Sequence, residues 1–338
     1  MNIENYMIPE LDNPRTIAAR ITAVHRERFE IMTGFGPGFA RMKRGLSFDE
    51  MPTVGDLIEI EFNPAGDSVA VAVLPRRTLF ARFDGWRGER QLVAANVDFA
   101  CITTSLNAEF NIRRLERYLA LARESGAEPV FLLTKRDLVD DLTAEAAAAQ
   151  VYGLAPDCRC FIISSRTGHG MDALRALLSP GSIAVLLGSS GVGKSSLVNA
   201  LLGAETMDTG EIRDDDKGRH TTVHRQMLEL STGALLIDTP GMRELGMWDA
   251  VDGVDDVFSE VAAAAQRCRF RDCTHTHEPG CAVLAGLEDG SLDPGRVQNF
   301  LKLHGEADLT AMLARKRERS KEISRFNRKM KKEGKIRY

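Results

Sequence analysis

The chain has 338 residues, of which 43% are hydrophobic and 27% are charged, so it can form two or three domains that each bury a core. No run of eighteen apolar residues occurs, and the acidic N-terminus lacks the basic and apolar pattern of a signal peptide, so we expect a cytoplasmic protein that does not bind membranes. Residues 315–337 contain twelve Lys and Arg against three Glu, and this local charge of +9 on an otherwise acidic chain indicates a polyanionic partner.

The N-terminal part of the chain predicts a small β-barrel. Short β-like stretches occur at residues 20–24, 29–32, 57–62 and 68–73, with glycine and proline between them. Several short strands with frequent turn signals are typical of a small barrel or sandwich. We interpret residues 1–85 as a barrel domain, and the pattern leaves the disposition of the first fifteen residues open.

Residues 86–247 predict a different fold class. Apolar strands are expected at 99–105, 129–133, 161–165, 183–187 and 235–237, and they alternate with helical patterns at 112–124, 144–153 and 194–202. Such alternation predicts βαβ units and a mostly parallel sheet, hence an α/β domain. Residues 248–338 have a helical, polar pattern and form a third expected domain, which contains a Cys/His cluster and the basic tail.

The strongest motif lies between the strand expected at 183–187 and the following helix. It matches the phosphate-binding loop G-x-x-x-x-G-K-[ST], here called the P-loop: Gly188, Ser189, Ser190, Gly191, Val192, Gly193, Lys194 and Ser195, followed by Ser196. The glycines let backbone N–H groups surround a phosphate at a helix N-terminus. Lys194 is expected to neutralise phosphate charge and Ser195 to bind Mg²⁺.

Two further segments fit the switches of a nucleotide hydrolase. Asp238-Thr-Pro-Gly241 follows a buried strand about fifty residues after the P-loop, where Asp238 can supply a second Mg²⁺ contact and the Gly241 amide can sense the γ-phosphate. Between them lies Gly-Arg-His220-Thr221-Thr222, and either threonine could complete the Mg²⁺ coordination.

A base-recognition motif precedes the P-loop. Thr134-Lys135-Arg-Asp137 approximates N-K-x-D, in which the carboxylate accepts hydrogen bonds from guanine, so Asp137 predicts GTP in preference to ATP. Thr134 replaces the usual Asn and removes an amide that helps to hold the loop, which predicts a weaker base affinity. Ser164 and Ser165 occupy the position of the element that contacts the guanine carbonyl.

The order of these motifs is unusual for a GTPase. The base motif and the serine pair come before the P-loop, whereas an ordinary GTPase has them after its switches. A circularly permuted domain can form the same sheet, because the termini of such domains often lie close together. The chain then leaves the domain directly after Gly241, so whatever follows is covalently attached to the second switch.

The last three of six cysteines indicate a metal site. Their spacing is Cys268-x4-Cys273-x-His275-x5-Cys281. Three thiolates and one imidazole complete a tetrahedral shell with no open position, which predicts one structural Zn²⁺. His277 is the alternative nitrogen ligand.

These motifs, in this order, resemble the ribosome small-subunit-dependent GTPase A family over nearly the whole chain. The most specific features are the permuted order, the string GRHTT at 218–222 and the Cys/His segment at 268–281. The resemblance implies an OB-type barrel that touches 16S rRNA. It also implies hydrolysis of GTP to GDP with stimulation by the 30S subunit, and a role in late small-subunit maturation through nucleotide-controlled binding and release.

The catalytic assignment comes from the same resemblance. Met242 stands where Ras-like enzymes carry a water-orienting Gln, so slow intrinsic turnover is expected. The resemblance implies that His220 is catalytic, alongside Lys194, Thr221 and Thr222, in a protein expected to be a monomer.

Two other classes of function remain open on the sequence. One is an RNA-binding module with a weakly active or vestigial nucleotide site, which the intact Lys194, Ser195 and Asp238 disfavour. The other is a P-loop kinase or ATPase, which Asp137 disfavours and the altered Thr134 leaves open.

Overall fold

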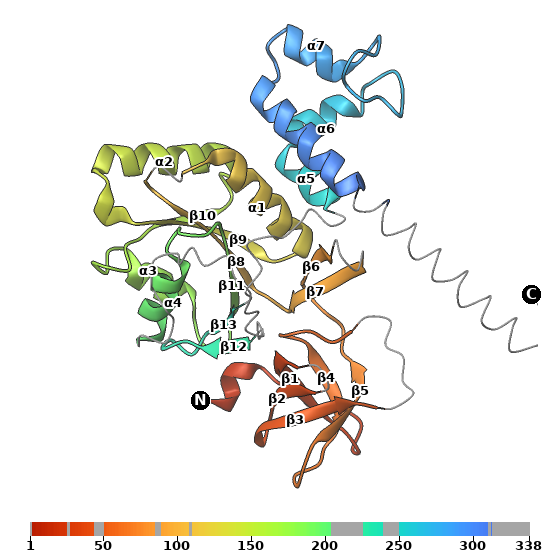
Figure 1. Ribbon diagram of the computed structural model, residues 1–338, viewed down its shortest axis with the longest axis vertical. Helices are drawn as coiled ribbons and strands as arrows, with labels where there is room; N and C mark the ends of the chain where they lie inside the picture. The colour runs from red at the N-terminus through yellow and green to blue at the C-terminus, as the bar shows by residue number, and fades with distance from the viewer. Residues whose placement is uncertain are drawn as a thin grey trace, which may run out of the picture. The chain divides into compact units, whose positions relative to one another are not determined.

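The structure is a computed structural model that describes residues 2–25, 28–43, 51–84, 89–107, 110–203, 226–238, 250–309 and 312 (Figure 1). The chain divides into two compact units, one of Met1–Phe80 with Leu92–Glu244 and one of Ala81–Gln91 with Leu245–Tyr338. The side chain of Asp238, the residues His220, Thr221, Thr222 and Gly241, and the basic tail lie outside the described parts. Among the described helices, none is both long and apolar enough to cross a membrane.

The first unit begins with the expected barrel. Its strands are β1 (Ile17–Val24), β2 (Phe29–Thr33), β3 (Gly36–Met42), β4 (Leu57–Glu61) and β5 (Ser68–Val73). Their order is β1-β2-β3-β5-β4, and β1 also pairs with β4, which closes the sheet on itself. The parallel pairing of β3 with β5 completes the topology of an OB-fold, so the predicted OB-type barrel is confirmed.

Side-chain alternation explains why these segments form a barrel. Ile58 and Ile60 on β4 are fully buried, whereas the residues on either side of them are partly or fully exposed. They pack with Ile21 of β1 and Ile31 of β2 in one apolar cluster. Each strand therefore presents one face to a common interior, as a period of two residues requires.

The same unit contains the predicted α/β sheet. Its strands are β8 (Phe99–Ser105), β9 (Glu128–Thr134), β10 (Arg159–Ile162), β11 (Ile183–Leu187), β12 (Gln226–Glu229) and β13 (Leu235–Asp238). The helical segments are α1 (Ile112–Ser125), η2 (Arg136–Leu138), α2 (Asp141–Leu154), α3 (Met171–Leu177) and α4 (Lys194–Leu202). The strand order is β10-β9-β8-β11-β13-β12, with β12 antiparallel to β13 and the other pairs parallel. β11 thus lies in the middle of the sheet although it comes late in the chain.

The barrel and the α/β sheet share backbone hydrogen bonding. β1 pairs antiparallel with β12 through Ala23 and Gln226, so the described strands of both form one continuous sheet. A short 3-10 helix, η1 (Ile3–Tyr6), precedes β1. The first residues of the chain, which the sequence pattern left open, therefore have a defined structure.

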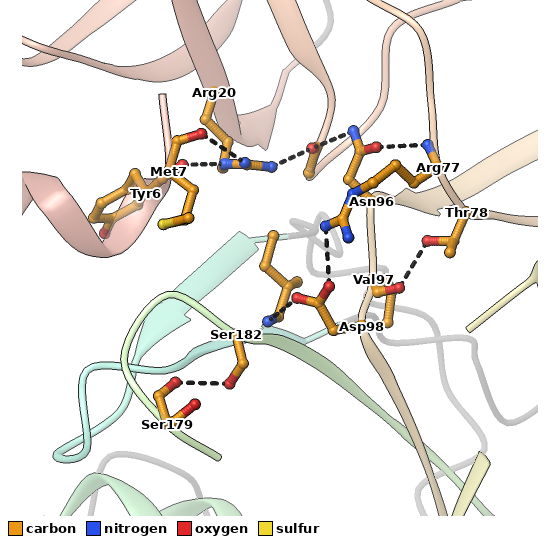
Figure 2. Close-up of polar contacts among 12 residues, drawn as sticks. Tyr6, Met7, Arg20, Arg77, Thr78, Asn96, Val97, Asp98, Ser179 and Ser182 are labelled. Atoms are coloured by element: carbon orange, nitrogen blue, oxygen red, sulfur yellow. Dashed lines mark hydrogen bonds and ion pairs between the residues drawn. The ribbon is translucent and has the colours of Figure 1, made fainter. Parts of the chain in front are cut away.

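A second, polar connection joins the end of the barrel to β11 (Figure 2). The Asn96 amide donates to the carbonyl of Gly55 and accepts from the N–H of Arg77, at 3.1 and 2.9 Å. The Arg77 guanidinium donates to Asp98, 2.9 Å away, and the other Asp98 oxygen accepts from the N–H of Ile183 at 2.8 Å. This series of contacts reaches the first residue of the strand that carries the P-loop.

The second unit is helical around the Cys/His segment. It contains α5 (Val251–Val257), α6 (Ser259–Ala265), α7 (Ala282–Glu288) and a helical stretch at 294–309. Phe258 and Phe300 pack edge to face with their ring centroids 6.0 Å apart. The strands β6 (Leu79–Asp84) and β7 (Glu89–Ala95) form a separate two-stranded sheet. The division into domains 1–85, 86–247 and 248–338 stays a prediction.

Candidate nucleotide and metal sites

The P-loop connects the buried strand β11 to α4. Gly188 has φ of +151°, and a Cβ at this position would lie 2.3 Å from the carbonyl oxygen of Thr103 on the neighbouring strand. Only glycine therefore lets the chain turn out of the sheet so close to β8. At the other end Gly193 caps α4 without a side-chain hydrogen bond. A loop of this kind leaves the first N–H groups of the helix to an anion.

Lys194 and Ser195 begin α4. The Lys194 ammonium donates to the carbonyl of Gly188 at 2.6 Å and also to that of Ser189. These hydrogen bonds place the Lys194 ammonium at the start of the P-loop, beside Gly188 and Ser189. Ser195 is half-buried in the first helical turn, and Leu197 and Leu201 bury the opposite face of the helix in the core of the sheet.

This donor set fits a nucleotide phosphate chain with Mg²⁺. The shape of the loop is fixed at its start by Gly188, which no side chain can replace, and at its end an ammonium and a hydroxyl directly follow Gly193. Mg²⁺ prefers oxygen ligands and keeps its waters, so one hydroxyl and one carboxylate suffice on the protein side. Ser195 is placed to supply the hydroxyl, and the sequence analysis expects the carboxylate from Asp238, the last residue of β13.

The base motif has a pre-oriented carboxylate. Asp137 lies in η2, where it accepts a hydrogen bond of 2.6 Å from the hydroxyl of Ser164. This hydrogen bond is the main reason why the pKa of Asp137 is lowered. Ser164 is itself fully buried and accepts from the N–H of Thr167, whereas Ser165 is half-buried. Asp137 is therefore ionised at neutral pH and can act as an acceptor for guanine.

Thr134 joins the base motif to the P-loop. Its side chain is 3% exposed, and its hydroxyl lies 2.6 Å from the carbonyl oxygen of Val192 and 3.2 Å from that of Thr104. The hydroxyl has one proton, which the shorter contact to Val192 uses. Lys135 donates to Gly191 at 2.7 Å. The hydroxyl of Thr134 thus makes a loop-holding contact of the kind that we expected to be lost with the Asn amide.

The Cys/His cluster has the dimensions of a zinc site. Ligand atoms of Cys268, Cys273, His275 and Cys281 all lie within 4.8 Å of one another. The Cys268 and Cys281 sulfurs are 3.8 Å apart, and each lies 3.5 Å from Nδ1 of His275. Tetrahedral zinc with bonds of about 2.3 Å to sulfur and 2.0 Å to nitrogen requires separations of about 3.8 and 3.5 Å. Cys268, Cys281 and His275 therefore have the separations of zinc ligands, and Cys273 lies within 4.8 Å of them as the fourth ligand of the set.

The environment of the cluster favours the metal-binding forms of its ligands. Burial lowers the pKa of His275, which favours the neutral imidazole. Burial disfavours the thiolate of Cys268. Hydrogen bonds to its sulfur, including one from the Ala282 N–H at 3.3 Å, favour the thiolate more strongly, so the pKa of Cys268 is lowered. The alternative ligand His277 hydrogen-bonds instead to the hydroxyl of Thr276.

Two residues that the sequence analysis did not single out support these sites. Arg114, in the first turn of α1, donates to the Ser189 hydroxyl at 2.8 Å. The helix-capping residue Asn111 could have predicted that α1 begins just before Arg114. Glu278 accepts from the N–H groups of Thr274, Thr276 and His277. It thereby fixes the loop around His275, and no local sequence pattern predicts that role.

Comparisons with known proteins agree with this geometry. A family model described as RsgA GTPase matches residues 73–248, and one described as 50S ribosome-binding GTPase matches residues 183–336. The small ribosomal subunit biogenesis GTPase RsgA 2 of Listeria monocytogenes is 44% identical over 341 residues, which cover 96% of each chain. The RsgA of Streptomyces avermitilis is 47% identical over 298 residues, 86% of this chain and 80% of its own.

Solved structures show the same fold. YjeQ from Thermotoga maritima has a TM-score of 0.62 at 25% identity, covering 86% of this chain and 98% of its own. YloQ, described as a circularly permuted GTPase, has a TM-score of 0.61 at 20% identity, covering 89% and 98%. The strand order with β11 at the centre accordingly belongs to a permuted GTPase fold.

We predict that Thr134→Val lowers the affinity for GDP by about tenfold, because an unpaired buried carbonyl at Val192 costs about 1–3 kcal/mol. Thr134→Ser keeps the hydroxyl and is expected to bind as the wild type does. Titration with a fluorescent GDP measures both. Wild-type affinity in the valine variant would show that the Thr134 hydrogen bond does not support the base site.

We predict one tightly bound zinc per chain, measured by atomic emission. Cys281→Ser is expected to lose the metal and to unfold the second unit at a lower temperature, because structural zinc contributes on the order of 10 kcal/mol to small domains. Cys160→Ser, which changes a cysteine on β10 outside the cluster, is the matched control. Retention of zinc by Cys281→Ser would exclude this ligand set.

Proposed function

The chain belongs to the RsgA GTPase family and is a GTP hydrolase, and we propose that it acts on the small ribosomal subunit during its late maturation. The nucleotide part of this proposal rests on the hydrogen bond between Thr134 and Val192, because it joins the base motif to the P-loop. GTP favours binding to the 30S subunit in this scheme, and hydrolysis to GDP releases the protein. The expected state is a cytoplasmic monomer.

The described residues have separate parts in hydrolysis. Asp137, oriented by Ser164, selects guanine, while the P-loop amides and Lys194 bind the phosphates. When bound, Mg²⁺ neutralises charge between the β- and γ-phosphates. We assign Ser195, Asp238 and one of Thr221 and Thr222 to the metal by their sequence positions.

The residue that activates the attacking water lies outside the described parts. We assign this activation to His220, and Gly241 to sensing the γ-phosphate, on the sequence motifs and the family resemblance. Because Met242 cannot orient water, turnover should be slow until a partner binds.

The loop around the Cys/His cluster, residues 267–281, is here called the zinc loop, and it offers a surface for RNA. Arg267, Arg269 and Arg271 are exposed, and Phe270 between them is 42% exposed. Within the part of the chain that the structure describes, no carboxylate forms an ion pair with these three arginines, unlike Arg175 and Arg296. Arg269 lies over the Phe270 ring at 5.5 Å. Interleaved cations and an exposed ring suit phosphate contact and base stacking.

The barrel offers a second surface of similar character. Phe35, 75% exposed on the turn between β2 and β3, stacks on Phe62 with ring centroids 5.2 Å apart. Arg28 lies 4.1 Å above the ring of Phe39 on β3. OB-folds bind nucleic acids through this face and its loops, so these rings support contact of the barrel with 16S rRNA.

We predict that purified 30S subunits stimulate GTP hydrolysis at least tenfold and that 50S subunits do not, measured as phosphate release. The comparison is needed because one matching family is described as 50S ribosome-binding. Stimulation by 50S alone would reverse the choice of partner. Tight GTP binding with stimulation by neither subunit would leave the GTPase and remove the ribosome from its function.

The same assay tests the catalytic assignment. His220→Ala should keep the affinity for GTP and lose most of the stimulated turnover. Because His25 lies in the barrel and pairs with Glu30, His25→Ala serves as a histidine control that should not affect catalysis. Equal stimulated rates in wild type and His220→Ala would exclude His220 as the catalytic group.

We predict that the double variant Arg269→Ala, Phe270→Ala binds 30S subunits about tenfold more weakly, because stacking of one base contributes about 1–3 kcal/mol. Arg175→Ala, which removes a half-exposed arginine already paired with Asp172, should bind normally. Co-sedimentation at two salt concentrations measures affinity and its salt dependence. Unchanged binding by the double variant would remove the zinc loop from the interface.

A further inference from the structure

The first residues of the chain form a clip, here residues 2–7, against strand β12. The N–H of Asn2 and the side-chain amide of Asn5 both donate to one carboxylate oxygen of Glu229, at 3.0 and 2.9 Å. Asn5 and Tyr6 are buried. Burial, and then the nearby charge of Glu229, raises the pKa of Tyr6 to about 12. The clip is therefore a packed part of the first unit.

A buried arginine holds the clip from the barrel side. Arg20 of β1 is 3% exposed, and it donates to the carbonyls of Tyr6, Met7 and Gly55 at 2.5, 3.3 and 2.9 Å (Figure 2). A buried guanidinium is costly unless its donors are satisfied, and here main-chain carbonyls satisfy them. Displacing the clip would remove two of these acceptors at once.

The other side of the clip contacts the turn between β12 and β13. Gly233 in that turn has φ of +81°, and a Cβ on it would lie 2.9 Å from the Asn5 amide nitrogen. The carbonyl of Gly233 accepts from the N–H of Gly181, and a Cβ on Gly181 would lie 3.1 Å from the sulfur of Met7. The clip thus lies in close contact with the turns that precede β11 and β13.

Strand β12 is held at both of its ends by the N-terminal part of the chain. Glu229, its last residue, binds the clip, and Gln226, its first, pairs with Ala23 of β1. Gln226 also pairs directly with Asp238, the last residue of β13. A shift of this four-residue strand would therefore move the backbone at Asp238.

We propose that Asn5 and Glu229 are positioning residues for the Mg²⁺-nucleotide site, which they affect by fixing β12 and, through Gln226, the backbone of Asp238. The inference deepens the proposed function and rests on its assignment of Asp238 to the metal. The same contacts let the barrel help to position the nucleotide site, because the clip connects β1 of the barrel to β12.

The test measures binding of a fluorescent non-hydrolysable GTP analogue to the full chain as Mg²⁺ is varied. Asn5→Ala and Glu229→Ala should raise the half-saturating Mg²⁺ concentration about threefold to tenfold, the range typical of coupling through intermediate residues. Their affinity for GDP in EDTA should stay within about twofold of the wild type, because the P-loop and base motif are unchanged.

Two matched variants separate positioning from general destabilisation. Glu229→Gln keeps a carbonyl oxygen that can accept from Asn2 and Asn5, so it should restore most of the wild-type Mg²⁺ dependence. Asn13→Ala removes an exposed amide that binds Glu59 of β4 on the barrel surface and should have no effect. If Asn5→Ala does not fold, the comparison of Glu229→Ala with Glu229→Gln decides alone.

Two results would overturn the inference. One is an unchanged Mg²⁺ dependence in both alanine variants. The other is a loss of GDP affinity in EDTA equal to the loss seen with Mg²⁺, which would indicate general destabilisation of the site. Because no ribosome is present, an absence of 30S stimulation in the wild type would contradict the proposed partner without affecting this test.

Discussion

A buried positive charge organises the first unit. The guanidinium of Arg20 is buried, so its donors must find protein acceptors, and they find carbonyls in the clip and in the loop before β4. One of those carbonyls, Gly55, also accepts from Asn96, where the contacts that lead to β11 begin. The conformations of two segments far apart in the sequence are therefore set by the same side chain. Burial lowers the pKa of Arg20 to about 10, which still leaves it charged at neutral pH.

Local patterns predicted the elements whose own residue composition matches the structure they form. The strands expected at 99–105 and 183–187 are β8 and β11 to the residue, because four apolar residues followed by β-branched threonines in β8, and an apolar run throughout β11, suit buried parallel strands. β3 was missed, since Gly36, Pro37 and Gly38 give a turn signal. Its pairing with β2 and β5 overrides that weak propensity.

The candidate sites also differ in how far their residues could be predicted from the sequence. The zinc ligands lie within fourteen residues of one another, so their spacing alone predicted the cluster that the structure brings together. The bond between Thr134 and Val192 joins residues 58 positions apart, and that between Asn5 and Glu229 joins residues 224 apart. No periodicity or short motif reports such pairs, because they exist only once the sheet has formed. The clip was consequently invisible in the sequence, whereas the P-loop was not.

The central place of β11 has a consequence for synthesis of the protein on the ribosome. β8, β9 and β10 are complete by residue 162, yet β8 is buried along almost its whole length only when β11 lies beside it. Until then the growing chain exposes an apolar strand with an unpaired edge, the kind of surface that aggregates or engages chaperones. The strand that ends this exposure is the one that carries the P-loop. The chain therefore gains its phosphate-binding loop in the same step in which the open edge of β8 is covered.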